Sequence, residues 1–230
     1  MKKIAILQSN YIPWKGYFDL INMVDEFILY DDMQYTKRDW RNRNKIQTPQ
    51  GLKWLSIPVE VKGKYFQKIN ETKINEKDWG KKHWAMIKQN YSKAKYFKEH
   101  KNIFEELYLD CNEEYLSQIN YKFIVSICKI LGITTTIRWS NEFELTDGQT
   151  EKLLGICKDC NADIYISGPA AKDYFDADLA KKENIKVEWM DYSGYKEYNQ
   201  LSPSFEHGVS ILDLIFNEGS NATKFMKSFV

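Results

Sequence analysis

The alternation of apolar and polar residues is clearest in the first 31 positions of the chain. Residues 3–7 form a short apolar run typical of a buried strand, and residues 8–16 contain Pro and Gly, which indicates a connection. Residues 17–24 carry apolar side chains at helical spacing, and a second apolar run, residues 27–30, ends at Asp31 and Asp32. A strand, loop, helix and strand of this length predict a right-handed βαβ unit with two parallel strands.

The middle of the chain predicts a hairpin followed by helices. Two short stretches, residues 45–47 and 53–59, flank the turn Thr48-Pro49-Gln50-Gly51, so we expect two strands appended to the edge of the sheet. From about residue 77 to residue 131 the apolar spacing is helical, with Trp79, His83, Ile87 and Tyr91 four apart and Gly132 as a stop. We interpret this stretch as a helical insertion between strands of the sheet.

After the insertion, strands and helices alternate again. Strands are predicted at residues 134–139, 163–167 and 186–189, and helices at residues 149–160 and about 177–182. This order predicts an α/β fold: an open, doubly wound, mostly parallel sheet of the Rossmann-like type, with a small hairpin and the helical insertion. At 230 residues, we expect a single α/β domain spanning residues 1–230.

Polar segments follow three of the predicted strands. They are residues 8–16, residues 31–43 and Ser167-Gly168-Pro169. Ligands of open α/β sheets bind outside the carboxyl ends of the strands, so we expect the three segments to converge. In particular, Gln8, Asn10, Asp31 and Arg41 should line one pocket. Ser167 and Gly168 alone could equally be a helix cap.

Arginines are concentrated in the second of these segments. Arg38, Arg41 and Arg43 are three of the four arginines in the chain, whereas the other 29 basic residues are lysine. A guanidinium retained among so many lysines favours planar, bidentate binding of phosphate or carboxylate. A solvated basic loop is the alternative. Against it stand nearby residues that could complete an anion site: Gln34, Tyr35, Lys37, Trp40, Asn42 and Asn44.

Overall charge and apolar content exclude several classes of protein. The net charge is +1, from 33 basic and 32 acidic residues, so the chain lacks the positive field of a nonspecific nucleic-acid binder, and we expect no nucleic-acid partner. No apolar run approaches the roughly 20 residues that span a bilayer, and the start does not resemble a signal peptide, so we expect a cytoplasmic protein. Cys157 and Cys160 form a lone C-x-x-C without a second ligand pair, which favours reduced thiols over zinc.

Longer motifs resemble those of a known family. They are Gln8-x-Asn10-Tyr11-x-Pro13-Trp14-x-Gly16-Tyr17-Phe18, Val24-Asp25-x-Phe27, Asp31-Asp32-x-Gln34-Tyr35-x-Lys37-Arg38-x-Trp40-x-Asn42-Arg43, Ser167-Gly168, and a closing segment from Ser210 to Asn217. With them the chain resembles the WbqC-like family of bacterial proteins found in surface-polysaccharide gene clusters. The resemblance implies a glycyl or other acyl transferase in O-antigen synthesis.

A second resemblance covers only the first βαβ unit. Its order is similar to that of the adenylyl-transferring Rossmann-like superfamily, which includes pantothenate synthetase and binds nucleotide phosphates through His-x-Gly-His. Trp14 and Tyr17 occupy the histidine positions here, and no Gly-rich phosphate loop is present, which argues against an adenylate-forming ligase or nucleotidyltransferase. That function and a non-catalytic module that binds a sugar nucleotide or a partner enzyme are the alternatives to a transferase.

Acyl transfer to an amino sugar assigns a role to each candidate residue. A base must accept the proton of the amine, for which we expect Asp31, Asp32 or His83, although His83 on an apolar helix face could be structural. The amides beside Gly16 or Gly168, or the Asn10 side chain, would stabilise the oxyanion. Arginines would hold the diphosphate of the nucleotide-linked sugar or the phosphate of an acyl-carrier or CoA-like donor. Tyr11, Trp14 and Trp40 offer flat faces for a sugar or a base. Asp31 and Asp32 could hold a Mg²⁺ ion bridged to the substrate diphosphate.

Overall fold

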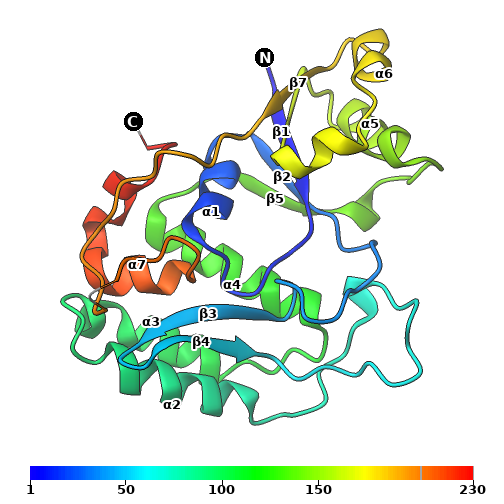
Figure 1. The fold of residues 1–230 in the computed structure, drawn as a ribbon. Helices are drawn as coiled ribbons and strands as arrows, with labels where there is room; N and C mark the ends of the chain where they lie inside the picture. Colours follow the sequence, from blue (N-terminus) through cyan, green and yellow to red (C-terminus); the bar gives the residue numbers. More distant parts are fainter. Residues whose placement is uncertain (203, 230) are drawn as a thin grey trace.

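Five parallel strands form the central sheet in the computed structural model, which describes residues 1–202 and 204–229. They are β1 (Lys3–Leu7), β2 (Glu26–Leu29), β5 (Thr136–Trp139), β6 (Ile164–Ser167) and β7 (Lys186–Trp189). Their order across the sheet is β5-β2-β1-β6-β7, and all neighbours pair in parallel (Figure 1). The order reverses between β1 and β6, as in doubly wound sheets, so the predicted α/β fold is confirmed.

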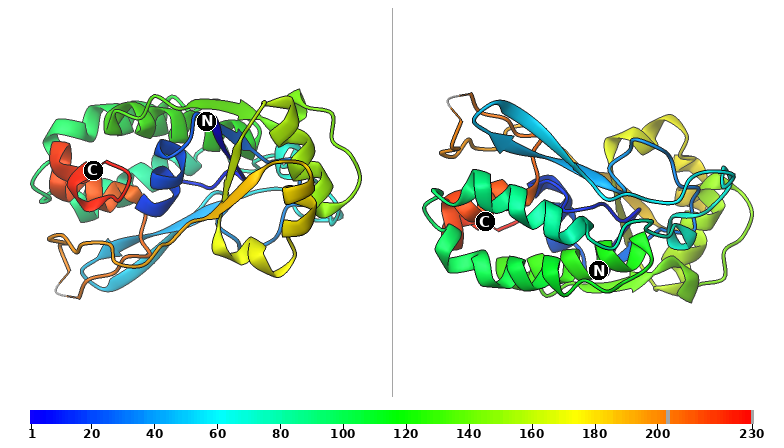
Figure 2. Two further views of the ribbon diagram at one scale, coloured as in Figure 1. Left: turned by 90° about the horizontal axis from the view of Figure 1, so that it is seen from above. Right: turned by 90° about the horizontal axis from the view of Figure 1, so that it is seen from below.

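The helices divide between the two faces of this sheet. Helix α1 (Lys15–Asn22) and the central helices contribute to the larger apolar cluster, whereas α5 (Gln149–Asp159) and α6 (Ala177–Lys182) pack in a second cluster. Successive side chains of a strand point to opposite faces of the sheet, so one strand contributes to both clusters. In β1, Ala5 belongs to the first cluster and Ile4 and Ile6 to the second. Figure 2 shows α5 and α6 at one end of the molecule, away from the C-terminal helices. Cys157 and Cys160 are buried thiols of the second cluster.

The hairpin does not join the edge of the five-stranded sheet. Strands β3 (Arg43–Thr48) and β4 (Gly51–Ser56) pair only with each other, so the predicted attachment to the sheet edge is wrong. The reason is that Ile46 and Leu55 of the hairpin are buried in the larger cluster. There β3 packs against α2 (Trp79–Tyr91) and α7 (Ile211–Glu218). Burial of this apolar face holds the hairpin over the helices instead of beside β5 or β7.

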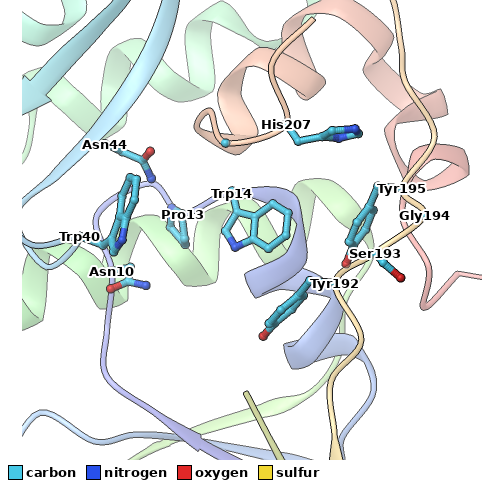
Figure 3. A pocket seen from close by; sticks show the side chains of 11 residues that line it. Asn10, Pro13, Trp14, Trp40, Asn44, Tyr192, Ser193, Gly194, Tyr195 and His207 are labelled. Carbon is cyan, nitrogen blue, oxygen red and sulfur yellow. The ribbon is translucent and has the colours of Figure 1, made fainter. Parts of the chain in front are cut away.

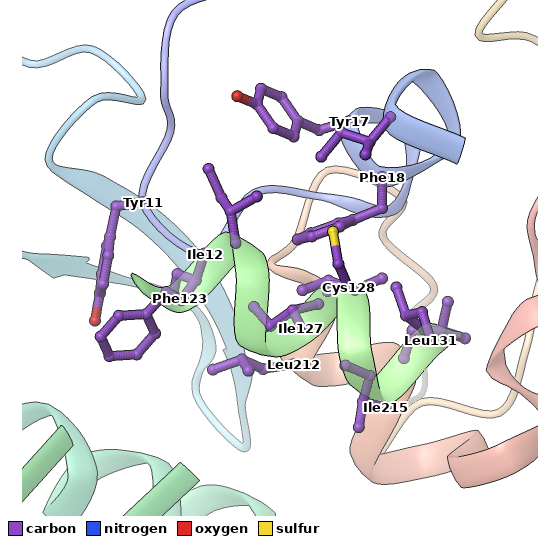
Figure 4. Packing of buried hydrophobic residues seen from close by; sticks show 14 of the residues in the cluster. Tyr11, Ile12, Tyr17, Phe18, Phe123, Ile127, Cys128, Leu131, Leu212 and Ile215 are labelled. Atoms are coloured by element: carbon purple, nitrogen blue, oxygen red, sulfur yellow. The ribbon is translucent and has the colours of Figure 1, made fainter. Parts of the chain in front are cut away.

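Helix α4 forms the middle of the larger cluster. Helices α3 (Phe97–Leu109) and α4 (Leu116–Leu131) complete the predicted helical stretch. Figure 4 shows Phe123, Ile127 and Leu131 of α4 between Phe18 of α1 and the apolar face of α7. Among the described residues, no helix is long and apolar enough to cross a membrane. Short 3₁₀ helices cover Ile69–Glu71, Ser140–Glu142, Pro169–Asp173 and Gly219–Phe225.

Predicted element boundaries differ from the structure at the hairpin, where strands expected at residues 45–47 and 53–59 span Arg43–Thr48 and Gly51–Ser56, and at α1. The structure confirms α6 and β7 at their predicted residues, and it places β1 at residues 3–7. The first helix was predicted at residues 17–24 but spans Lys15–Asn22, because Gly16 lies inside its first turn and Met23 already caps its end. A glycine that resembled a breaker in the sequence is therefore part of the helix.

Candidate functional site

A cavity of about 750 Å³ lies beside the carboxyl ends of the parallel strands. Its walls come from the segments that follow β1, β2 and β7, from β3, and from the turn before α7. The lining residues are Asn10, Pro13, Trp14, Trp40, Asn44, Tyr192, Ser193, Gly194, Tyr195, His207 and Gly208 (Figure 3). The cavity lies at the carboxyl ends of the strands, where the sequence predicts a ligand (the strand-end rule), although the loop after β6, with Ser167 and Gly168, does not line it.

Two tryptophans and two tyrosines line the cavity. The indole of Trp14 meets the rings of Tyr192 and Tyr195 edge to face, with centroids 5.3 and 5.5 Å apart. Trp40 stands on the opposite side, beside Asn10 and Asn44 (Figure 3). Flat apolar faces with a few amide groups suit a ring-shaped ligand with polar substituents, such as a sugar or a base.

Asn10 owes its orientation to Arg41. The Arg41 guanidinium donates from Nη1 to Oδ1 of Asn10, and its Nη2 lies 3.6 Å from a carboxylate oxygen of Asp39. Burial lowers the pKa of Arg41, and the charge of Asp39 opposes this, so the group stays ionised as guanidinium does in proteins. Because Oδ1 of Asn10 is engaged, the amide presents its Nδ2 as a hydrogen-bond donor to the cavity.

The loop after β1 is also held by two buried polar groups beneath it. Asp31 is 1% exposed and accepts hydrogen bonds from the Ser9 backbone nitrogen (2.8 Å) and the Ser117 hydroxyl (2.5 Å). Asn120 donates to the Ser9 hydroxyl and to the Arg41 carbonyl oxygen, both at 2.9 Å. Burial raises the pKa of Asp31, and the hydrogen bonds and Arg41 oppose the rise. Asp31 therefore anchors the loop.

The four residues expected in one pocket are close together but do not share its surface. Asn10 bonds Arg41, and Asp31 lies under the neighbouring Ser9, but of these four residues only Asn10 lines the cavity. Gln8 contributes its carbonyl oxygen, which accepts from the Tyr17 hydroxyl at 3.0 Å. The prediction that all four line one pocket is therefore wrong: only Asn10 does, while Arg41 bonds Asn10 and Asp31 bonds the neighbouring Ser9.

Asp32 faces a different set of partners from Asp31. It accepts hydrogen bonds from the Ser140 hydroxyl (2.6 Å), from Asn70 (3.3 Å) and from the Lys68 ammonium (3.3 Å). Burial raises its pKa, but these donors outweigh burial and hold the pKa of Asp32 below its ordinary value. With their oxygens already bonded to protein donors, the two carboxylates do not fit a shared Mg²⁺ site. No cluster of three potential metal-ligating side chains occurs within the described residues.

His83 and Tyr11 lie in the core and not in the cavity. The imidazole is 6% exposed, its Nδ1 lies 2.8 Å from the Tyr11 hydroxyl, and its Nε2 lies 3.2 Å from the Ser56 carbonyl oxygen. Burial lowers the pKa of His83 to about 4. Tyr11 is fully buried, and its hydroxyl also lies 2.9 Å from that of Tyr108. Neither residue reaches the cavity, because α2 packs its apolar face inward. His83 is therefore buried in the way expected of a structural histidine and not of a base.

The arginine-rich segment does not present its guanidinium groups together. Arg41 is turned inward to Asn10, whereas the Arg43 guanidinium stacks 4.1 Å from the Trp54 ring centroid and donates to the Arg38 carbonyl oxygen. Arg38 and Lys37 are exposed, and Gln34 donates to the Tyr65 carbonyl oxygen at 2.8 Å. The three guanidinium groups therefore do not form the joint anion site that the sequence suggested.

Sequence reasoning missed the aromatic wall after β7 and the imidazole of His207. Residues 192–195 follow the predicted strand at residues 186–189, so the strand-end rule could have included them. His207 lay in a turn without a motif. Its Nδ1 is buried without a partner among the described residues, and burial, then the charge of Lys15, lowers its pKa. The shift favours the neutral form of the imidazole that lines the cavity.

Comparison with known proteins gives a match over almost the whole chain. The model of the WbqC-like protein family matches residues 8–225, a range that contains every residue lining the cavity. An uncharacterized protein of Mycobacterium tuberculosis is 51% identical over 227 residues, which cover 99% of this chain and 98% of that relative. No solved structure matches the chain.

Proposed function

The chain belongs to the WbqC-like protein family, and on this premise we propose that it is a transferase that acylates the amino group of a nucleotide-linked sugar bound in the cavity. The observation that carries the proposal is the imidazole of His207 in a cavity whose wall also contains the rings of Trp14 and Tyr192. Such a wall suits a sugar ring, and a neutral imidazole is the base that an amine nucleophile needs.

In the proposed reaction, His207 transfers one proton from the amine to the leaving thiolate. The sugar amine attacks the carbonyl carbon of an acyl thioester, supplied by an acyl carrier or a CoA-like donor. The new C–N bond forms as the C–S bond breaks, and the electron pair of that bond leaves with sulfur. His207 accepts the amine proton and returns it to the departing thiolate, which restores the neutral base.

In this scheme the oxyanion of the tetrahedral intermediate is stabilised by Asn10. Arg41 holds Oδ1 of Asn10, so the amide offers Nδ2 to the cavity. A fixed donor in a site shielded from water commonly contributes 10² to 10³ in kcat. Asp31, Asp32 and His83, the bases expected from the sequence, have no place in this scheme because none of them lines the cavity.

The test is acyl transfer measured by mass spectrometry. The wild type, His207→Gln and His83→Gln are incubated with nucleotide-linked amino sugars and short-chain acyl-CoA thioesters. We expect an amide product with the wild type, a rate loss of about 10² or more with His207→Gln, and retained turnover with His83→Gln. Equal rates for the wild type and His207→Gln would refute the assignment of the base. Sugar-nucleotide binding without any product from the panel would leave only the non-catalytic module.

A further inference from the structure

We propose that the outer face of the β3–β4 hairpin binds the nucleoside diphosphate part of the ligand, outside the cavity, with the base on Trp54 and Trp40 and the phosphates on Lys45 and Arg43. The inference rests on the proposed function only in that the sugar attached to this nucleotide would enter the cavity. It adds the direction of the ligand: sugar inward, nucleotide outward.

Strand register gathers these side chains on one face. Lys45 pairs with Trp54 and Arg43 with Ser56, and alternate residues of a strand point to the same side. Ile46 and Leu55, on the other side, are buried in the core at 0% and 1% exposure. The face with Trp54 is therefore directed away from the core.

Two tryptophans make a partly exposed aromatic surface there. Trp40 and Trp54 have ring centroids 5.3 Å apart with an interplanar angle of 42°, and they remain 41% and 39% exposed. Trp40 lines the cavity whereas Trp54 does not, so the pair extends the aromatic wall beyond the cavity mouth. Large aromatic side chains left exposed beside a cavity indicate a binding surface for a flat ligand.

Two cations accompany the rings without acidic partners. Nζ of Lys45 lies 5.3 Å from the Trp54 centroid and 5.9 Å from that of Trp40, and Cζ of Arg43 lies 4.1 Å from the Trp54 centroid. In residues 1–202 and 204–229 neither cation is within ion-pair distance of a carboxylate, and Nε of Arg43 is buried without a hydrogen bond. Lys64, in contrast, forms an ion pair with Glu60.

Rings and unneutralised cations together define the ligand class. A base stacks on an aromatic face, and a phosphate is bound by ammonium and guanidinium groups, so one molecule carrying both satisfies the whole surface. A free sugar would leave the cations without a partner, and inorganic phosphate would leave the rings without one. A nucleoside diphosphate is the class that uses all four side chains.

Titration calorimetry with uridine, cytidine, guanosine and thymidine diphosphates tests the inference. For the diphosphate that binds the wild type best, Trp54→Ala should weaken affinity about tenfold or more, and Trp54→Phe should recover most of it. Lys45→Met should reduce the dependence of affinity on salt. Lys53→Met, a matched loss of charge at an exposed position of β4 whose side chain lies on the opposite face from Trp54, should leave affinity and its salt dependence unchanged. Thermal unfolding of each variant reports whether the fold is retained.

The outcomes separate this inference from the proposed function. Wild-type affinity in Trp54→Ala, or no binding of any of the four diphosphates, overturns the nucleotide site even if acyl transfer is observed. Conversely, binding that depends on Trp54 without any amide product supports the nucleotide site and refutes the transferase.

Discussion

The indole of Trp14 occupies the space that a side chain at Gly16 would fill. A Cβ at Gly16 would lie 2.3 Å from Cζ2 of Trp14, far inside van der Waals contact. The two residues lie at the start of α1, where Trp14 is the N-cap and Gly16 is in the first turn. The glycine thus allows the indole to fold back against its own helix and to form the cavity wall.

Gly16→Ala should displace Trp14 and weaken ligand binding in the cavity. Overpacking of this kind costs roughly 1 to 3 kcal/mol in stability, and the moved indole no longer faces Tyr192 and Tyr195. Gly155→Ala in α5 is the matched control, because its nearest non-local atom, Oγ1 of Thr146, is 3.7 Å from the new Cβ. We expect the control to be neutral or stabilising by roughly 0.5 to 1 kcal/mol. Equal stability in urea unfolding and equal ligand affinity in calorimetry for the two variants would contradict this prediction.

His83 should make stability depend on pH in a defined window. Its pKa is lowered by burial to about 4 in the folded protein, from 6.5 as the ordinary value. The unfolded chain therefore binds more protons between these values, and the free energy of unfolding falls as pH decreases from about 7 towards 4. From pH 7.5 to pH 5 this residue should account for a loss of roughly 2 kcal/mol.

Urea unfolding of the wild type and His83→Gln at both pH values measures that contribution. Glutamine does not titrate, so the variant should lose less stability on acidification than the wild type, and the other titrating groups cancel in the comparison. Parallel losses in the two proteins would mean that His83 is not held neutral by burial.

Arg41 and Asn10 should act on ligand binding as one unit. Arg41→Lys conserves the charge but replaces the guanidinium that fixes Oδ1 of Asn10, and loss of such a charge-assisted bond should weaken cavity binding about tenfold. In an Asn10→Ala background, the same Arg41→Lys change should have less than about a threefold effect, because its partner is absent. A double-mutant cycle by calorimetry checks this. Full additivity would show that Arg41 contacts the ligand by itself.

Removal of divalent cations should not affect the protein. Asp31 is bonded by Ser9 and Ser117, and Asp32 by Ser140, Asn70 and Lys68, so neither offers a free carboxylate to Mg²⁺. We expect equal ligand affinity and acyl transfer in excess EDTA and in millimolar Mg²⁺. Activity that disappears in EDTA and returns with Mg²⁺ would contradict this reading of the two carboxylates.

The order and type of the secondary elements could be predicted because local patterns determine them. Apolar runs of strand length identified β1 and β6, and helical spacing through Trp79, Ile87 and Tyr91 identified α2. The βαβ unit and the strand-end rule then located the edge of the sheet where the cavity lies. These features depend on neighbours within a few turns of chain.

The members of the site could be predicted only in part. Asn10, Trp14 and Trp40 lie in the segments between β1 or β2 and the next element, and they line the cavity as expected. Nothing in the pattern around residue 207 distinguished a cavity histidine from a loop residue. By contrast, His83 was a candidate base in the sequence, but it is buried in the core.

The sequence by itself determined an α/β sheet with a polar edge, because periodicity and turn residues act over short distances. Only the tertiary structure decided which side chains share the cavity. Trp14 meets Tyr195 across about 180 positions of sequence, and Arg41 is turned to Asn10 and not to its neighbours Arg38 and Arg43. Such contacts depend on how distant segments pack against one common core, and no local pattern records that packing.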